Sequence, residues 1–354
     1  MKIVVYLNEP AKYTVSLTEE VYSRFHVEYY YDLRNTLHNN KDFNFQFLRE
    51  MPLLRRWKLY YYNWKNADLI ISNGYLFDFF VITFLLNVLT FRWKPIAIES
   101  DTPFLTSVSL QQRLGKLLKG FYFRFPFIYG FAAGSVLHRD YFTRNGMKTD
   151  RVFLMPWVSL NYDFHNIKTI TAPFIFTYIG RFVDFKRIPV IIEEFLFAFN
   201  NRTDSQLKLV GDGPLLESLK SQFKDQRNVI FTGKLFDEAL EEVFKTSHCL
   251  VLSSIPEMWG LVVNEALSAG MPVLLSKYAG SRYDLVDGKD TGIIFDPLKK
   301  GDLAKAMVTI ASSKELYELY SKNGRRLMHE HWNYTFYAEC FEKATTEIYN
   351  KHHR

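Results

Sequence analysis

Short apolar runs alternate with amphipathic stretches across residues 174–276, and no other feature limits the fold of this chain as strongly. The runs are rich in β-branched and aromatic residues, which favours strands, and the stretches between them have helical periodicity. The predicted elements are strands at 174–179, 207–210, 229–232, 249–253 and 272–276 and helices at 190–199, 215–223, 238–245 and 261–268. Such alternation predicts a doubly wound parallel sheet.

The first half of the chain shows the same alternation less clearly. The apolar stretch 79–91 is too short to span a membrane and is predicted to be a buried helix. Further strands are predicted at 3–7, 69–71, 96–99, 133–137 and 152–155. The fold class that we expect is therefore α/β, with two Rossmann-like doubly wound domains.

The length of 354 residues suits two domains of ordinary size. The polar segment 166–173 has no period of its own and ends in proline, so it is predicted to link the domains. This division gives an N-terminal domain at 1–165 and a C-terminal domain at 174–333. Residues 334–354 are predicted to form a helix that returns toward the N-terminal domain.

Two cysteines, Cys249 and Cys340, leave no disulfide framework and no cysteine-based metal site, which is typical of a reducing compartment. The sequence runs from Met1 straight into a predicted strand, with no apolar leader and cleavage site. We therefore expect a cytoplasmic protein, with the inner face of the cell membrane as a second possible location.

The net charge of +6 is unevenly placed. Residues 1–165 hold 20 Lys and Arg against 14 Asp and Glu, whereas residues 166–354 hold 24 of each. A basic half indicates an anionic partner, which is a nucleic acid, a phosphorylated substrate or an anionic membrane. Nucleic-acid binding is disfavoured because no motif for it accompanies the charge.

The strongest motif lies in residues 253–273, which are predicted to form a strand, a loop, a helix, a glycine stop and a second strand. The loop Glu257–Gly260 follows the carboxyl end of a parallel strand, where open α/β sheets bind ligands. The helix that begins at Leu261 presents free N–H groups that suit a diphosphate. Glu265 lies in its first turns, so Glu257 and Glu265 are predicted to point into one crevice, where carboxylates can accept bonds from sugar hydroxyls. A solvated loop carboxylate and a helix-favouring glutamate are the simpler alternative.

A second motif places Gly180, Arg181 and Lys186 directly after a predicted strand. Two cations at a strand's carboxyl end can neutralise a leaving diphosphate as negative charge develops. Two further strand-end turns, which contain Gly211, Gly213, Lys234 and Leu235, are predicted to place backbone where a flat base packs. Solvated cations and ordinary strand-ending glycines are the alternatives for each motif taken alone.

With these motifs the chain resembles the retaining glycosyltransferases of family 4, which have two domains facing across a cleft in the GT-B architecture. The E-x7-E motif of that family matches Glu257 and Glu265, and its Gly-Arg…Lys element matches Gly180, Arg181 and Lys186. Its Gly-Asp-Gly-Pro and Phe-x-Gly turns match residues 211–214 and 231–233. The resemblance covers roughly residues 133–332.

The resemblance implies that Arg181 and Lys186 hold the donor diphosphate and act in catalysis with Glu257, which holds the donor sugar. It implies that Glu265 binds the ribose and that the backbone near Lys234 and Leu235 contacts the base. The donor-binding set expected from the motifs also contains Gly180, Gly211, Gly213, Met258, Trp259, Gly260 and Leu261, with Met258 and Trp259 expected to influence the choice of sugar.

The N-terminal half departs from the family pattern at residues 98–103, where a His-Asp pair is common in the family and Ser100 stands in place of the histidine. Glu99 and Asp101 are candidates to orient an acceptor hydroxyl, and capping of the next segment is the alternative. No D-x-D motif occurs, so no metal or cofactor is expected. The implied substrate is a UDP or GDP sugar.

The acceptor implied is a glycan or a polyprenyl-linked molecule in cell-surface polysaccharide or lipopolysaccharide synthesis. Cations mix with leucines and aromatic residues at 55–58, 91–94 and 113–126, which favours peripheral association with an anionic membrane over a buried helix with a basic edge. A nucleotide-sugar 2-epimerase of the same architecture and a non-catalytic sugar-binding protein are the alternative functions.

Overall fold

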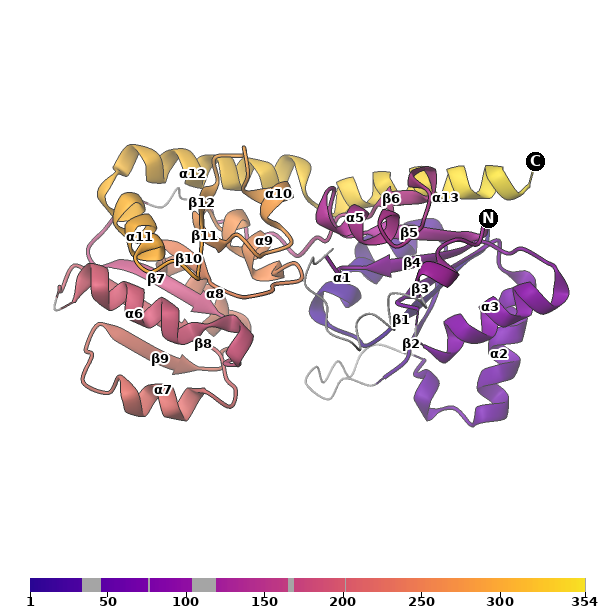
Figure 1. Ribbon diagram of the computed structural model, residues 1–354, viewed down its shortest axis with the longest axis horizontal. Coiled ribbons are helices and arrows are strands. Elements are labelled where there is room, and N and C mark those ends of the chain that lie inside the picture. The colour runs from indigo at the N-terminus through magenta and orange to yellow at the C-terminus, as the bar shows by residue number, and fades with distance from the viewer. Residues whose placement is uncertain (34–45, 76, 104–118, 165–168, 201, 354) are drawn as a thin grey trace. The chain divides into compact units, whose positions relative to one another are not determined.

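The computed structural model describes residues 1–33, 46–75, 77–103, 119–164, 169–200 and 202–353. The chain forms two compact units (Figure 1). Unit 1 comprises Met1–Ser159 and Tyr334–Arg354, and unit 2 comprises Leu160–Asn333. The chain therefore leaves unit 1 after Ser159, ahead of the predicted linker at 166–173, of which residues 166–168 lie outside the described part. The last helix groups with unit 1.

Unit 1 is a parallel six-stranded sheet with the strand order β2-β1-β3-β4-β5-β6. Its strands are β1 (Ile3–Leu7), β2 (Glu28–Tyr31), β3 (Leu69–Asn73), β4 (Ile96–Ser100), β5 (Ile128–Ala132) and β6 (Val152–Leu154). Its described helices are α1 (Lys12–Glu20), α2 (Leu53–Asn66), α3 (Asp78–Thr90), α5 (Leu137–Thr143) and α13 (Tyr334–His352).

The two faces of this sheet carry different helices because successive strand residues point to opposite faces. On one face Tyr6 of β1 packs between Tyr60 of α2 and Phe79 of α3, at ring centroid distances of 5.7 and 4.7 Å. On the other face Glu99 of β4 accepts a hydrogen bond from Tyr337 of α13. α2 and α3 thus cover one face, and α13 lies on the other.

The strand predicted at 133–137 is wrong, because β5 ends at Ala132 and α5 begins at Leu137. Gly130 lies inside β5, and glycine lowers the strand signal of a sequence. A Cβ atom at Gly130 would lie 2.7 Å from the ring of Phe142, so α5 packs against the strand at a place that only glycine leaves open. The glycine that obscured the strand is therefore required by its packing.

The helix predicted at 79–91 is present as α3, but only one side of it is buried. Phe79, Phe80 and Phe84 face the core, whereas Leu85 and Leu89 are exposed. Among the described residues, no helix combines the length and apolar content needed to cross a bilayer.

Unit 2 is a second parallel sheet, with the strand order β12-β11-β10-β7-β8-β9. Its strands are β7 (Phe174–Ile179), β8 (Ser205–Val210), β9 (Val229–Gly233), β10 (Cys249–Leu252), β11 (Val273–Ser276) and β12 (Gly292–Phe295). Its α-helices are α6 (Ile188–Phe199), α7 (Leu216–Gln222), α8 (Asp237–Thr246), α9 (Leu261–Ser268), α10 (Arg282–Leu285), α11 (Asp302–Ser312) and α12 (Lys314–Arg326). The predicted α/β class, with two Rossmann-like domains, is confirmed.

Candidate functional site

The candidate site lies where the strand order of unit 2 reverses direction. From β7 the chain adds β8 and β9 on one side, then crosses to add β10, β11 and β12 on the other side of β7. Open α/β sheets bind ligands outside the carboxyl ends of the two strands that flank such a reversal, which here are β7 and β10. The two motifs singled out in the sequence follow these two strands.

The structure joins the two motifs through Lys186 and Glu257. The ammonium Nζ of Lys186 donates a hydrogen bond to Oε2 of Glu257, and both side chains are largely shielded from solvent. Ser254, which is fully buried, donates a second bond to the same oxygen at 2.7 Å. A carboxylate that accepts from both a cation and a hydroxyl is held in one orientation.

The backbone around this pair is also fixed. The hydroxyl of Ser253 donates to the carbonyls of Lys186 and Arg187 at 2.7 and 3.1 Å, so the loop after β7 is tied to the end of β10. The N–H of Glu257 donates to the carbonyl of Tyr278, and the carbonyl of Glu257 accepts from the N–H of Gly280. The serines at 253 and 254 were not identified from the sequence, although they stand in the motif that contains Glu257.

The turns that follow β7 and β8 are each hydrogen-bonded to the last residue of the neighbouring strand. The N–H of Gly180 donates to the carbonyl of Val210 at 3.0 Å, and that of Gly211 donates to the carbonyl of Gly233 at 2.9 Å. A Cβ atom at Gly211, where φ is +140°, would lie 1.8 Å from the carbonyl oxygen of Gly180. The backbone is thus closely packed at Gly180, Gly211 and Gly213, and the expected contact of these glycines with the donor stays a prediction.

Arg181 is exposed immediately after the first of these turns. Its carbonyl accepts a 2.8 Å hydrogen bond from the hydroxyl of Tyr178, a buried residue of β7. Burial raises the pKa of Tyr178, the carboxylate of Glu257 raises it further, and the guanidinium of Arg181 opposes the increase. The bond from Tyr178 fixes the backbone of Arg181 directly after β7, and the contact of the guanidinium with a diphosphate stays a prediction.

Helix α9 supplies the rest of the expected donor site. Gly260 precedes its first residue, Leu261, and adopts a left-handed conformation with φ of +87°. Met258 is exposed in the loop before it. Glu265 is half-buried in the second turn, and its carboxylate adds to the effect of burial in raising the pKa of Tyr162. The bond of Glu265 to a ribose stays a prediction.

One of the expected donor residues, Trp259, is a packing residue of unit 2, whereas the expected backbone contact of Lys234 and Leu235 with the base stays a prediction. Trp259 is 1% exposed, stacks on Trp332 at a centroid distance of 5.6 Å, and donates from Nε1 to Asn264 at 2.9 Å. Its indole is part of the packing of unit 2, so the influence on sugar choice expected from its side chain is not supported. Lys234 is exposed, and its ammonium lies 4.7 Å from the centroid of the Phe236 ring, while Leu235 is half-buried.

The acceptor residues suggested in unit 1 are not equivalent. Glu99 is 5% exposed, and its carboxylate accepts from the hydroxyl of Tyr337 at 3.2 Å. Burial raises the pKa of Glu99, and the carboxylate of Asp101 raises it further. The position of Glu99 fits an attachment for α13 rather than the expected contact with an acceptor. Asp101 is half-buried after β4, and its role stays a prediction.

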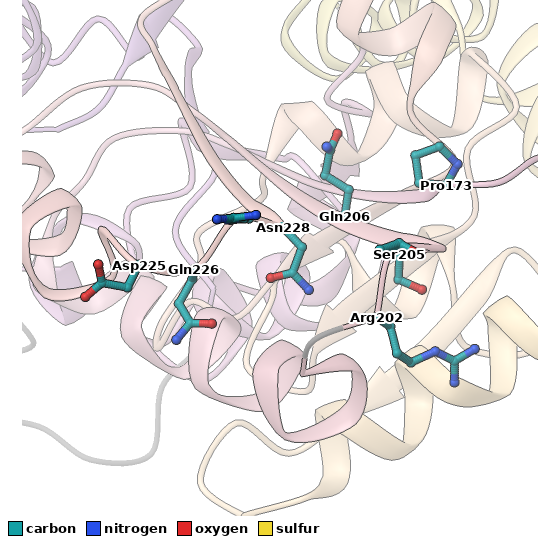
Figure 2. A pocket seen from close by; sticks show the side chains of 9 residues that line it. Pro173, Arg202, Ser205, Gln206, Asp225, Gln226 and Asn228 are labelled. Carbon is teal, nitrogen blue, oxygen red and sulfur yellow. The ribbon is translucent and has the colours of Figure 1, made fainter.

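A cavity of about 520 Å³ lies at the opposite end of the unit 2 sheet (Figure 2). Its walls include Pro173, Gln206 and Asn228, which lie at the amino ends of β7, β8 and β9. It is therefore remote from the turns that carry Arg181 and Glu257. Among the residues that the structure describes, no three His, Cys, Asp or Glu side chains form a group able to hold a metal ion.

Comparisons with known proteins agree with this arrangement. Residues 163–327 match the family model of the glycosyl transferases group 1. A relative at 32% identity over 152 residues is the sulfoquinovosyl transferase SQD2 of Arabidopsis thaliana, with 42% of this chain and 28% of the relative aligned. Another, at 28% identity over 173 residues, is the alpha-monoglucosyldiacylglycerol synthase of Streptococcus pneumoniae, with 45% and 38% aligned.

Among solved structures, the HepE protein of Anabaena in complex with UDP is similar to this chain with a TM-score of 0.77 and 16% sequence identity, over 98% of this chain and 100% of that one. This likeness shows the fold. The chain spans less than half the length of the two curated relatives named above, and the similarity to them lies in one part of it. The matched stretch 163–327 contains Arg181, Lys186, Glu257 and Glu265, so the similarity to the glycosyl transferases group 1 includes the expected donor site.

Proposed function

We propose that this protein is a retaining glycosyltransferase that moves a sugar from a nucleoside-diphosphate sugar to a glycan or lipid-linked acceptor. The observation that carries the proposal is the hydrogen-bonded pair of Lys186 and Glu257 at the strand-order reversal of unit 2. It brings a cation and a carboxylate from two motifs to the place where the fold binds ligands. Both residues lie in the stretch that matches the glycosyl transferases group 1, which supports the proposed sugar transfer.

The donor diphosphate is proposed to lie over Arg181, Lys186 and the amino end of α9. In the reaction the bond between the anomeric carbon and the phosphate oxygen breaks, and the bond to the acceptor oxygen forms on the same face of the sugar. The acceptor's proton passes to the leaving phosphate. Positive charge fixed before the reaction stabilises the leaving group as its negative charge grows. Because these two side chains supply that charge, we propose that the transfer needs no metal.

A sugar hydroxyl is proposed to bond to the carboxylate of Glu257. With Ser254 and Lys186 both bonded to Oε2, this side chain is oriented before the donor arrives. Preorganised groups of this kind lose little entropy on binding. UDP is a reasonable first nucleotide to test, because it is bound in the structurally similar HepE protein. GDP is the second.

The acceptor is proposed to be presented at the cytoplasmic face of the cell membrane, in the synthesis of a surface polysaccharide or lipopolysaccharide. One relative supports a lipid-linked acceptor, since the alpha-monoglucosyldiacylglycerol synthase is named for a diacylglycerol product. The excess of cations in residues 1–165 supports it as well, because anionic lipids attract basic surfaces.

A thermal-shift screen of nucleoside-diphosphate sugars tests the donor site. A true donor present at about 100 times its Kd stabilises the folded protein by about 2.7 kcal/mol. The expected result is a clear increase in Tm with one nucleotide sugar and a smaller one with its free nucleoside diphosphate. A screen in which UDP, GDP and their sugars all leave the Tm unchanged would refute the donor site.

Two controls make the screen specific to transfer. Incubation of the stabilising donor with the enzyme alone should yield no isomerised sugar, because an isomerised sugar would indicate an epimerase. A transfer assay that also contains the acceptor should give the same rate with and without a chelator, since the proposal assigns the metal's role to Arg181 and Lys186.

A further inference from the structure

Exposed apolar side chains are concentrated on one part of unit 1. Among the described residues, 22 large apolar side chains are exposed, and 11 of them lie between residues 53 and 121. Most of these project from α2, from α3 or from the segment that follows α3. Soluble monomers seldom expose many large apolar side chains in one area without a binding role. We call this area the α2–α3 surface and define it by Leu54, Trp57, Tyr61, Leu89, Phe91 and Trp93.

The α2–α3 surface is continuous because its two helices pack side by side (Figure 1). Near their carboxyl ends the indole of Trp64 in α2 donates to Asn87 of α3 at 2.8 Å. Tyr61 contacts Trp64 at a ring centroid distance of 5.7 Å, so the exposed row of α2 reaches the boundary with α3. Asn87 also donates to the carbonyl of Lys94, which holds the segment of Phe91 and Trp93 against α3.

Phe91 is poorly suited to its position if only folding is considered. It ends α3 in the left-handed conformation, with φ of +54°, and 85% of it is exposed. Glycine and asparagine are favoured in this conformation, and bulky side chains are disfavoured. An exposed phenylalanine there neither relieves strain nor fills the core, so the side chain points to a contact outside the chain.

Cations surround these apolar side chains, and few acids do. Residues 51–98 contain six Lys and Arg and two acids, Asp68 and Asp78. Both acids are engaged within unit 1: Asp68 accepts from the backbone of Lys2, and Asp78 bonds to Arg56. In contrast, the cations at 55, 58, 65 and 92 are exposed. The surface is therefore both apolar and positively charged.

We propose that the α2–α3 surface binds the interfacial region of an anionic lipid bilayer, with Leu54, Leu89 and Phe91 entering the acyl boundary and Arg55, Lys58 and Arg92 bonding to lipid headgroups. This inference deepens the proposed function by assigning the membrane contact to named residues. An apolar row flanked by cations is the composition of interfacial helices. Of the segments that the sequence indicated for membrane contact, 55–58 and 91–94 lie on this surface, whereas 113–118 lie outside the described residues.

A bilayer fits this surface better than an acidic protein does. A protein partner of a basic surface needs placed carboxylates, and its apolar contacts need matching pockets, whereas a lipid interface accepts any row of aliphatic and aromatic side chains. The apolar side chains here come from two helices and a connecting segment. Binding to a second protein, or to a second copy of this chain, remains an outcome of the experiment.

Co-sedimentation of the full chain with vesicles tests the proposal in the absence of any donor or acceptor. Phosphatidylglycerol–phosphatidylcholine vesicles should sediment the protein at low salt, and neutral phosphatidylcholine vesicles should not. High salt should weaken the binding, because it screens charges at the surface. The variant Leu54→Ser/Leu89→Ser/Phe91→Asn should lower the partition coefficient by about tenfold or more, because three large apolar side chains no longer enter the bilayer.

Matched variants separate binding from folding and from catalysis. Phe197→Ser/Leu319→Ser removes two exposed apolar side chains of unit 2 and should leave vesicle binding unchanged. Arg55→Gln/Lys58→Gln/Arg92→Gln should weaken binding at low salt and remove most of its salt dependence. Each variant should retain the donor-induced increase in Tm, so a failure of the donor site and a failure of the membrane surface are distinguishable.

Tryptophan fluorescence gives a second measurement. Of the six tryptophans, Trp57 and Trp93 are 52% and 55% exposed, and the others are buried or half-buried. Anionic vesicles should therefore shift the emission to shorter wavelength and protect it from acrylamide. Unchanged quenching, or equal vesicle binding by the apolar variant and the unit 2 control, would overturn the proposal. So would a dimer in sedimentation velocity that the apolar variant loses while vesicle binding persists.

Discussion

At the scale of single residues, the candidate site depends on one oxygen atom. Oε2 of Glu257 accepts from both Lys186 and Ser254, and Ser253 holds the backbone that carries Lys186. Glu257 and Lys186 were predicted to be site residues because they stand in recognisable motifs. The sequence did not predict their direct bond, because residues 71 positions apart meet only when β7 and β10 pair. The two serines were missed because serine is common at strand ends and has no distinctive spacing.

Lys186→Ala should lower turnover by about a hundredfold to a thousandfold, since a hydrogen-bond donor aimed at the charge that develops in the transition state contributes about 3–4 kcal/mol. The loss should appear mainly in kcat, because the leaving diphosphate is more charged than the bound one. Steady-state kinetics with varied donor measures this split. Lys245→Ala, which removes a surface lysine paired with Glu241 on α8, is the matched control and should change neither constant. Equal kcat values for the two variants would contradict the assigned role.

Ser254→Ala should raise the KM for the donor and reduce kcat, each by a few fold, because Glu257 loses one of the two bonds that orient it. A net loss of about 1–2 kcal/mol is expected when one buried hydrogen bond is removed. The difference in KM and kcat between variant and wild type should be larger with donors that have the sugar hydroxyl bonded to Glu257. With deoxy donors that lack this hydroxyl, the two enzymes should differ little. A uniform loss with every donor, together with a lowered Tm, would indicate a structural role instead.

At the scale of elements, the alternation of strands and helices was predictable because each unit repeats one simple pattern. The predicted helix at 261–268 and the predicted strand at 3–7 coincide with α9 and β1. Errors arose where tertiary packing overrides local preference, as at Gly130, where Phe142 occupies the space that a side chain would need. The half-exposed state of α3 was also unpredictable, since an apolar sequence does not tell which side meets solvent.

Gly211→Ala should destabilise unit 2 and abolish donor-induced stabilisation. Its Cβ atom would lie 1.8 Å from the carbonyl oxygen of Gly180, and this backbone contact cannot be relieved by a rotamer change. Gly288 is the matched control, because its φ is also positive, +69°, but no atom lies within 4 Å of its Cβ position. Gly288→Ala should cost only the conformational penalty of about 1–2 kcal/mol. Calorimetry with and without donor compares the two, and similar Tm values would contradict the close stacking.

At the scale of the whole molecule, the chain returns to unit 1 after it completes unit 2. The sequence predicted that a helix at 334–354 returns toward the N-terminal domain. It did not predict the contact that holds this helix, because Glu99 and Tyr337 are far apart in sequence. Tyr337 donates to Glu99, its hydroxyl lies 3.4 Å from that of Tyr22, and Phe341 packs on Tyr22 at 5.5 Å. A buried carboxylate with phenol partners therefore holds the last helix in place.

This anchor predicts a dependence of stability on pH. Burial raises the pKa of Glu99 above its usual value of 4.5, hydrogen bonds from Tyr337 and Asn73 oppose part of the increase, and Asp101 adds to it. Because the folded pKa lies above the unfolded one, the contribution of Glu99 to stability is complete below the unfolded pKa and is lost as the pH rises through the folded pKa. Glu99→Gln keeps an acceptor for Tyr337 and does not titrate. As the pH rises, the free energy of unfolding should therefore fall less in the variant than in the wild type. Above pH 4.5 the variant should become increasingly more stable than the wild type.

Denaturant unfolding at a series of pH values measures that difference, and Glu217→Gln, at a carboxylate whose side chain is 82% exposed, is the control that should track the wild type. Hydrogen exchange in α13 adds a local measurement, since the helix should become less protected in the wild type as Glu99 ionises, and not in the variant. If the unfolding curves of Glu99→Gln and wild type stay parallel across this range, Glu99 is either ionised throughout or exposed to solvent. An ionised Glu99 would still accept the bond from Tyr337, whereas an exposed Glu99 would leave the attachment of α13 to aromatic contacts such as Phe341 on Tyr22.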